Sequence, residues 1–153
     1  MPELKLPTKP VENWESIRDS WIRAVEELVS NVEVWCKARG WPTRRIEKRM
    51  EDRKLGEYLA PALLIQVDLV KLMLEPVARF VPGADGVVDL YLMPAYDDMA
   101  SVYLRDGVWQ IHYSVAGDAV PQELRQADPS HSAAQLIQPF TEEQFAKVIK
   151  QMV

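Results

Sequence analysis

The stretch MASVYLRDGVWQIHY, residues 99–113, constrains the fold of this chain more than any other. Asp106-Gly107 lies between two runs rich in β-branched and aromatic residues, which is typical of a two-residue hairpin turn. That turn sets a register in which apolar residues face one another, namely Leu104 with Trp109, Val102 with Ile111 and Ala100 with Tyr113. The other face carries Tyr103 with Gln110 and Ser101 with His112. One buried face and one partly polar face predict an antiparallel sheet.

A long amphipathic helix is expected before this sheet. Apolar residues recur at spacings of three and four, or their sum, at Trp14, Ile17, Trp21, Ala24, Leu28 and Trp35, with Val25, Val32 and Cys36 widening the stripe. Asn13 is a good N-cap residue, Gly40 suits a left-handed C-terminal cap, and Pro42 prevents continuation. The pattern predicts one helix from about residue 13 to residue 39.

Three further strands are expected between this helix and the hairpin. A turn at Asp85-Gly86 precedes a strand through Met93, which Pro94 stops. Residues 58–81 fit two strands that turn near Val67-Asp68, but they also fit a helix. Their β-branched content and the sheet that follows favour the strands.

The C-terminal region predicts a short helix. Thr141 and Gln144 have the spacing of a capping box. The expected fold is therefore α+β, with a long N-terminal helix and a short C-terminal helix packed on an antiparallel meander sheet of about five strands. Residues 1–12 are expected to form an extended, proline-punctuated arm, and residues 13–153 a single domain.

Composition limits the class of protein. A chain of 153 residues with 48% apolar and 27% charged residues can bury one core. Cys36 is the only cysteine, so no intrachain disulfide can form, which fits a reducing cytoplasm. The N-terminus lacks the apolar core of an export signal, and the longest stretch without Asp, Glu, Lys or Arg is residues 129–141. Neither a secreted nor an integral membrane protein is expected, because a spanning helix needs about 20 apolar residues.

Asp89 is the strongest candidate for metal-dependent hydrolysis. A strand carboxylate after a helix is a feature of nuclease-type metal sites, which also need a second acid and a lysine one or two strands later. No lysine occurs between Lys71 and Lys147. The favoured interpretation is that Asp89 faces the open side of the sheet and pairs with an arginine such as Arg79.

The other catalytic candidates are Asp97, Asp98 and His112. Two adjacent acids in a loop usually cap a turn. His112 lies on the polar face of the hairpin, and neither it nor His131 has an ordered nucleophile and orienting acid in the sequence. Phosphate-binding glycine loops are absent, and no cofactor or metal is expected.

Charge is distributed unevenly along the chain. Residues 37–54, the basic segment, hold eight basic and three acidic residues and carry +5, so the remaining residues carry −10 of a total of −5. Such an asymmetry can steer an acidic partner. Alternatively, neighbours such as Arg44 with Glu47 and Lys48 with Glu51 neutralise one another on a solvated face. As a strand, the segment would place Ile46, Lys48 and Met50 on one face and Arg45, Glu47, Arg49 and Glu51 on the other; as a helix, it would group Ile46 with Met50.

These patterns favour a non-catalytic cytoplasmic protein that binds a macromolecule through the basic segment. The contact residues predicted for this surface are Trp41, Arg44, Arg45, Arg49 and Arg53. A protein partner with an acidic surface is the first expectation, and nucleic acid is the second, because an aromatic ring beside arginines suits either; no membrane partner is expected. The alternative is a metal-dependent hydrolase or nuclease-like enzyme, intact or degenerate, that uses carboxylates around Asp89.

Overall fold

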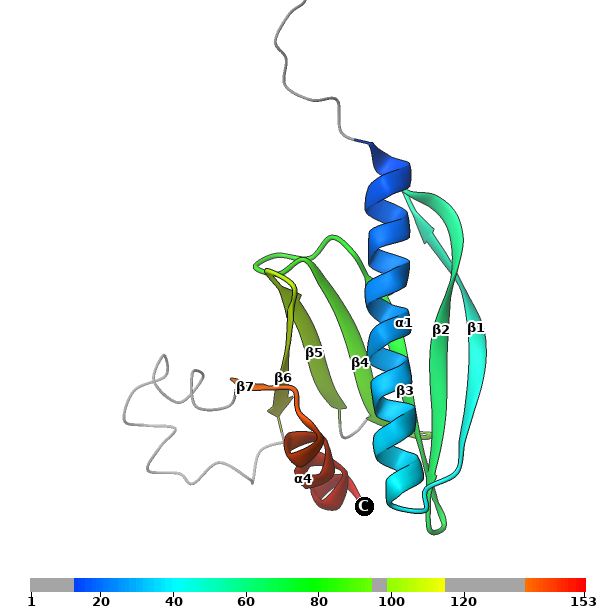
Figure 1. Cartoon of the computed structure of the whole chain (residues 1–153), viewed down its shortest axis with the longest axis vertical. Helices are drawn as coiled ribbons and strands as arrows, with labels where there is room; N and C mark the ends of the chain where they lie inside the picture. The colour runs from blue at the N-terminus through cyan, green and yellow to red at the C-terminus, as the bar shows by residue number, and fades with distance from the viewer. Residues whose placement is uncertain (1–12, 95–98, 115–136) are drawn as a thin grey trace, which may run out of the picture.

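The structure is a computed structural model that describes residues 13–94, 99–114 and 137–153. Its elements in chain order are α1 (Trp14–Ala38), β1 (Thr43–Asp52), β2 (Gly56–Val67), β3 (Val70–Ala78), β4 (Gly86–Leu92), β5 (Met99–Arg105), β6 (Val108–Ser114), β7 (Ile137–Pro139) and α4 (Glu142–Met152). The strands form one antiparallel sheet in the order β1-β2-β3-β4-β5-β6-β7. Helix α1 lies across one face of this sheet, and α4 packs beside its C-terminal end (Figure 1).

The predicted α+β class is confirmed, but the described residues form a sheet of seven strands rather than about five. One added strand is β1, which occupies the basic segment and pairs with β2 from Thr43–Ile65 to Asp52–Gly56. The other is the short β7, which pairs with β6. Residues 58–81, for which a helix was the alternative, lie largely in β2 and β3.

The ends of α1 follow the capping signals in the sequence. The Asn13 side chain accepts a hydrogen bond of 3.1 Å from the Ser16 amide. Gly40 has a φ of 75°, the left-handed conformation that ends a helix, and the Trp41 amide then donates to the Cys36 carbonyl. The chain leaves α1 in a fixed direction and enters β1 immediately.

The predicted β5–β6 hairpin is present in the predicted register, with Leu104 opposite Trp109 and Ala100 opposite Tyr113. Asp106 and Gly107 both have positive φ, as a two-residue turn with the twist of the strands requires. Asp68, in the turn between β2 and β3, also has a positive φ, of 55°. Short turns of this kind keep consecutive strands adjacent in the sheet.

The core fills the space between the sheet and the two helices. Its central strand residues are all at most 2% exposed, namely Leu63, Leu72, Leu74, Leu90, Val102 and Ile111. Helix α1 adds Trp21, Val25, Leu28, Val29, Val32 and Cys36, and α4 adds Phe145, Val148, Ile149 and Met152. The opposite face of the sheet carries Glu75, Asp89, Ser101 and His112 in adjacent pairs across β3, β4, β5 and β6.

Aromatic rings join α4 to the end of α1. Phe145 lies with its ring centroid 5.7 Å from that of Trp35 and 6.1 Å from that of Trp41. The Thr141 hydroxyl accepts a hydrogen bond from the Gln144 amide, as the capping-box spacing predicted. The short helix is thereby held where α1 gives way to β1.

Candidate functional site

The fold separates the two ends of the basic segment. Trp41 precedes β1, Arg44 and Arg45 begin the strand, Arg49 lies toward its end, and Arg53 lies in the turn before β2. Ten residues of β-strand span about 33 Å. The five predicted contact residues therefore line a long edge rather than one compact patch.

Arg45 is held by α1. Its guanidinium donates to Glu33 at 3.0 Å, to Glu26 at 2.8 Å and to the Ser30 hydroxyl at 2.8 Å. The hydrogen bonds to Glu33, and then those to Glu26, raise the pKa of Arg45 above its ordinary value. This side chain connects β1 to the helix, and its charge is already balanced within the molecule.

The other three arginines are different. Arg44, Arg49 and Arg53 are exposed, and none makes an ion pair within the described part of the chain. At the turn, the neighbouring Lys54 places its ammonium over the rings of Trp14 and Phe80, 5.3 Å and 5.2 Å from their centroids. The free positive charge of the basic segment is thus spread along the exposed side of the β1–β2 ribbon.

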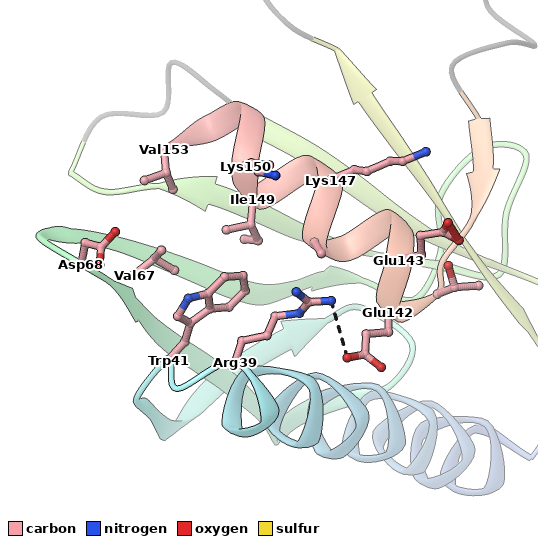
Figure 2. Close-up of a pocket in the computed structure, with 12 residues that line it drawn as sticks. Arg39, Trp41, Val67, Asp68, Glu142, Glu143, Lys147, Ile149, Lys150 and Val153 are labelled. Carbon is pink, nitrogen blue, oxygen red and sulfur yellow. Dashed lines mark ion pairs between the residues drawn. The ribbon is translucent and has the colours of Figure 1, made fainter.

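Trp41 lines a groove of about 1000 Å³ where the end of α1, the β2–β3 turn and α4 meet (Figure 2). The groove is lined by Arg39, Trp41, Val67, Asp68, Thr141, Glu142, Glu143, Ala146, Lys147, Ile149, Lys150 and Val153. Trp41 and Ile149 point toward its interior from opposite walls. Its volume is at the upper end of the range for ligand pockets, and part of its lining is apolar.

Charged side chains surround the apolar part of the groove lining. The Arg39 guanidinium lies 5.7 Å from the centroid of the Trp41 ring and 3.7 Å from a Glu142 carboxylate oxygen. Lys147 and Lys150 are exposed on α4, with no ion pair to any described residue. The carboxylates of Asp68 and Glu143 lie toward opposite ends of the groove, and the Lys150 ammonium and Arg39 guanidinium lie between them (Figure 2). The middle of the groove is therefore its cationic part.

A second polar cluster surrounds Asp89 on the open face of the sheet. The Ser101 hydroxyl donates to Asp89 at 3.1 Å, and Glu75 lies directly opposite Asp89 on β3. Glu75 accepts a hydrogen bond of 2.8 Å from the Tyr91 hydroxyl and forms an ion pair of 3.2 Å with Lys48. The expected pairing of Asp89 with Arg79 is wrong, because Arg79 donates to the Asp85 carbonyl.

Burial is the main cause of a raised pKa at Asp89. The hydrogen bond from Ser101 and the charge of Lys48 act in the opposite direction, and the neighbouring Glu75 carboxylate raises the pKa further. A carboxyl group in these surroundings holds its proton to higher pH than an exposed aspartate does. Two carboxyl groups and a lysine thus meet on one face of β1, β3 and β4.

Of the other catalytic candidates, only His112 can be placed relative to this cluster. His112 faces Ser101 across β5 and β6, while Asp97, Asp98 and His131 lie outside the described residues. Cys36 is buried in the core, and burial raises the pKa of its thiol to about 12, which leaves it un-ionised at neutral pH. Within residues 13–94, 99–114 and 137–153, no group of three His, Cys, Asp or Glu side chains is placed to hold a metal ion.

The sequence analysis did not identify several residues of the groove beside Trp41 and of the cluster around Asp89. Lys48 and Glu75 precede Asp89 in the chain, whereas the search for a metal-binding lysine looked only at later strands. Arg39 was counted in the basic segment without a site, and Lys147 and Lys150 had no local pattern to distinguish them. Spacing on the C-terminal helix could have placed Lys147 and Lys150 near one another, but not opposite Trp41.

Comparisons with known proteins found no matching family model, curated protein or solved structure. None of the helices in the described residues has the length and apolar character needed to cross a membrane.

Proposed function

We propose that this protein works by binding a protein partner through the groove between Trp41 and α4. The occupant is a short acidic segment of the partner that carries an apolar side chain beside its carboxylate. The observation that supports this proposal is the position of Arg39 and Trp41, two members of the basic segment, across the groove from α4, whose Lys147 and Lys150 make no ion pair with a described residue.

The chemistry of the groove favours such a segment. An apolar side chain would lie on Val67, Ile149 and Trp41, where it leaves water, while a carboxylate would reach Lys150 or Arg39. Asp68 and Glu143 at the two ends disfavour a long anionic chain, because its outer charges would approach like charges. A compact acidic and apolar motif therefore fits better than the phosphate backbone of a nucleic acid.

Titration of the full chain with a defined peptide tests this function. The probe is an acetylated, amidated peptide with a central Glu-Leu-Glu, and backbone amide shifts in NMR spectra report where it binds. We expect shifts concentrated at Arg39, Trp41 and α4. Trp41→Ala, or Lys147→Glu combined with Lys150→Glu, should weaken binding about tenfold or more, since buried aromatic anchors and charge pairs dominate small interfaces.

Lys71→Glu is the matched control, because Lys71 is an exposed lysine on β3 that does not line the groove. It should leave binding unchanged. Shifts scattered over the surface, or equal losses in the control and in the α4 double variant, would contradict the proposal.

The second candidate function is hydrolysis at the Asp89 cluster, because Lys48, Glu75 and Asp89 bring together residue types that metal-dependent nucleases use. Calorimetric titration with Mn²⁺ tests it. Saturable binding that Asp89→Asn abolishes would support an enzyme. Heats that are identical for the parent chain and for Asp89→Asn would leave the cluster as a structural network of the sheet.

A further inference from the structure

The outer edge of β1 is not covered by any of the residues that the structure describes. Among them, β1 is the first strand of the sheet and pairs only with β2, along ten residues (Figure 1). An edge of this length presents unpaired backbone groups that can template another strand. Which strand can pair with this edge depends on the side chains of β1 itself.

The charges of β1 are arranged symmetrically about Lys48. In an antiparallel pair of strands, hydrogen-bonded and non-hydrogen-bonded residue pairs alternate along the ladder. A two-fold axis cannot exchange one kind of pair for the other, so it must pass through a pair in which the same residue of both copies lies face to face. An axis at Lys48 overlaps residues 44–52. The remaining pairs are then Arg44 with Asp52, Arg45 with Glu51, Ile46 with Met50, and Glu47 with Arg49.

Other symmetric registers fit less well. An axis at Glu47 places Arg45 opposite Arg49, and an axis at Arg49 places Glu47 opposite Glu51, so each opposes like charges. An axis at Met50 also pairs opposite charges, but within β1 it overlaps only residues 48–52. The register centred on Lys48 combines the longest overlap with full charge complementarity off the axis.

The single like-charge pair of this register, Lys48 with its own copy, is already compensated. The Lys48 ammonium lies 3.2 Å from a Glu75 carboxylate oxygen and 2.8 Å from the Pro76 carbonyl oxygen. These contacts draw the side chain toward β3, back over its own sheet. Two such lysines at the axis therefore meet as neutralised groups.

The flanking charges remain to be satisfied. Arg44, Glu47, Arg49 and Glu51 are all exposed, and none makes an ion pair with another described residue. Charged edges often serve only to prevent association, but in the register centred on Lys48 the charges on either side of the axis are opposite in sign. Arg44, Glu47 and Arg49 would each meet an opposite charge on a second copy. Glu51 would meet Arg45, whose guanidinium already binds Glu26 and Glu33.

We propose that two copies of this chain associate through their β1 edges, antiparallel around a two-fold axis at Lys48, so that the two sheets become continuous. The pairing is small and its charges are exposed, so the dimer is concentration-dependent and weakens as salt rises. This interface lies outside the groove and does not depend on the proposed peptide binding.

Charge exchange at the pair beside the axis tests the dimer. Sedimentation equilibrium of the full chain over a range of concentrations gives its dissociation constant. Arg49→Glu places two glutamates opposite each other twice per dimer, and Glu47→Arg does the same with arginines. Each variant alone should weaken the dimer about tenfold or more.

Restoration separates this register from a general charge effect. An equal mixture of the two single variants should form a heterodimer, because positions 47 and 49 are then both acidic in one copy and both basic in the other. The double variant Glu47→Arg/Arg49→Glu should again form a homodimer. Lys71→Glu and Trp41→Ala should leave the dissociation constant unchanged, and circular dichroism should show that every variant is folded.

Several outcomes would overturn the proposal. They are a parent chain that stays monomeric at millimolar concentration, single variants that dimerise like the parent, and a mixture that shows no heterodimer. The two single variants could also change the binding of an acidic peptide at β1 in opposite directions, with Glu47→Arg strengthening it. That result would instead identify the edge as a site for an acidic strand of another protein.

Discussion

At the scale of single residues, the core is specified by a few polar atoms as well as by apolar volume. Trp21 is 1% exposed, and its indole N–H donates to the Tyr58 hydroxyl at 3.1 Å. This bond connects α1 to β2 inside the core. Burial raises the pKa of the Tyr58 phenol, so the group is un-ionised at neutral pH.

Tyr58→Phe should destabilise the protein by about 1–3 kcal/mol, because the buried Trp21 N–H loses its acceptor. Urea denaturation followed by circular dichroism measures the free energy of unfolding. Tyr103→Phe is the control, since Tyr103 is half-buried and its hydroxyl has no bond to a described residue. Equal effects of the two substitutions would show that the hydrogen bond contributes nothing.

Asp89→Asn should raise the free energy of unfolding at neutral pH. The folded state raises the pKa of Asp89, so ionisation costs stability: the contribution is fully favourable below the unfolded pKa and is lost as pH rises through the folded pKa. The asparagine oxygen can still accept from Ser101. Thermal melts at pH 7 should therefore favour the variant, and melts at pH 3 should show little difference.

The exposed Asp19 provides the control for this comparison. Asp19→Asn should change the melting temperature little at pH 7. A lower melting temperature for Asp89→Asn at pH 7 would mean that the ionised carboxylate is needed by its neighbours.

At the scale of elements, the spacing between α1 and the sheet depends on one glycine. Gly86 begins β4, and a Cβ at this position would overlap the six-membered ring of Trp21. The helix can approach the sheet this closely only because residue 86 has no side chain. Trp21 in turn lies beside Trp109 of β6, with ring centroids 6.1 Å apart.

Gly86→Ala should destabilise the protein by about 1–3 kcal/mol, the usual cost of overpacking a core. Combining it with Trp21→Phe should recover part of that loss, because the smaller ring frees the space. The parent chain, the two single variants and the double variant of this cycle can be compared by urea denaturation. Strictly additive effects would show that residue 86 and the indole do not interact.

Element prediction succeeded where local signals agreed and failed where a distant partner decided. The hairpin register and both helix caps follow from neighbouring residues, so the sequence predicted them. In β1, Arg44 with Glu47 and Lys48 with Glu51 fit helical spacing as well as a strand. Pairing with β2 along ten residues decides the matter, and local propensity cannot report such tertiary contacts.

At the scale of the whole molecule, the fold class was predictable but the candidate groove was not. Trp41 was correctly singled out as lying beyond the helix cap, yet its groove is completed by α4, about a hundred residues later. The same holds for Lys48 and Asp89, which the order of the strands in the sheet brings together. A single sequence gives no information on contacts of that range.

From β1 to β6, each strand pairs with the strand that follows it in the chain. Contacts between sequence neighbours close short loops, which lose little entropy and are made quickly. A meander can thus form one hairpin at a time, whereas a sheet in which the first strand pairs with the last cannot form that pair until the whole chain is available. During synthesis α1 emerges before the strands, and the β1–β2 hairpin that follows it supplies both Arg45 and Tyr58 to hold it. We expect the earliest folded unit to be this helix with its first hairpin, onto which the later strands are added in order.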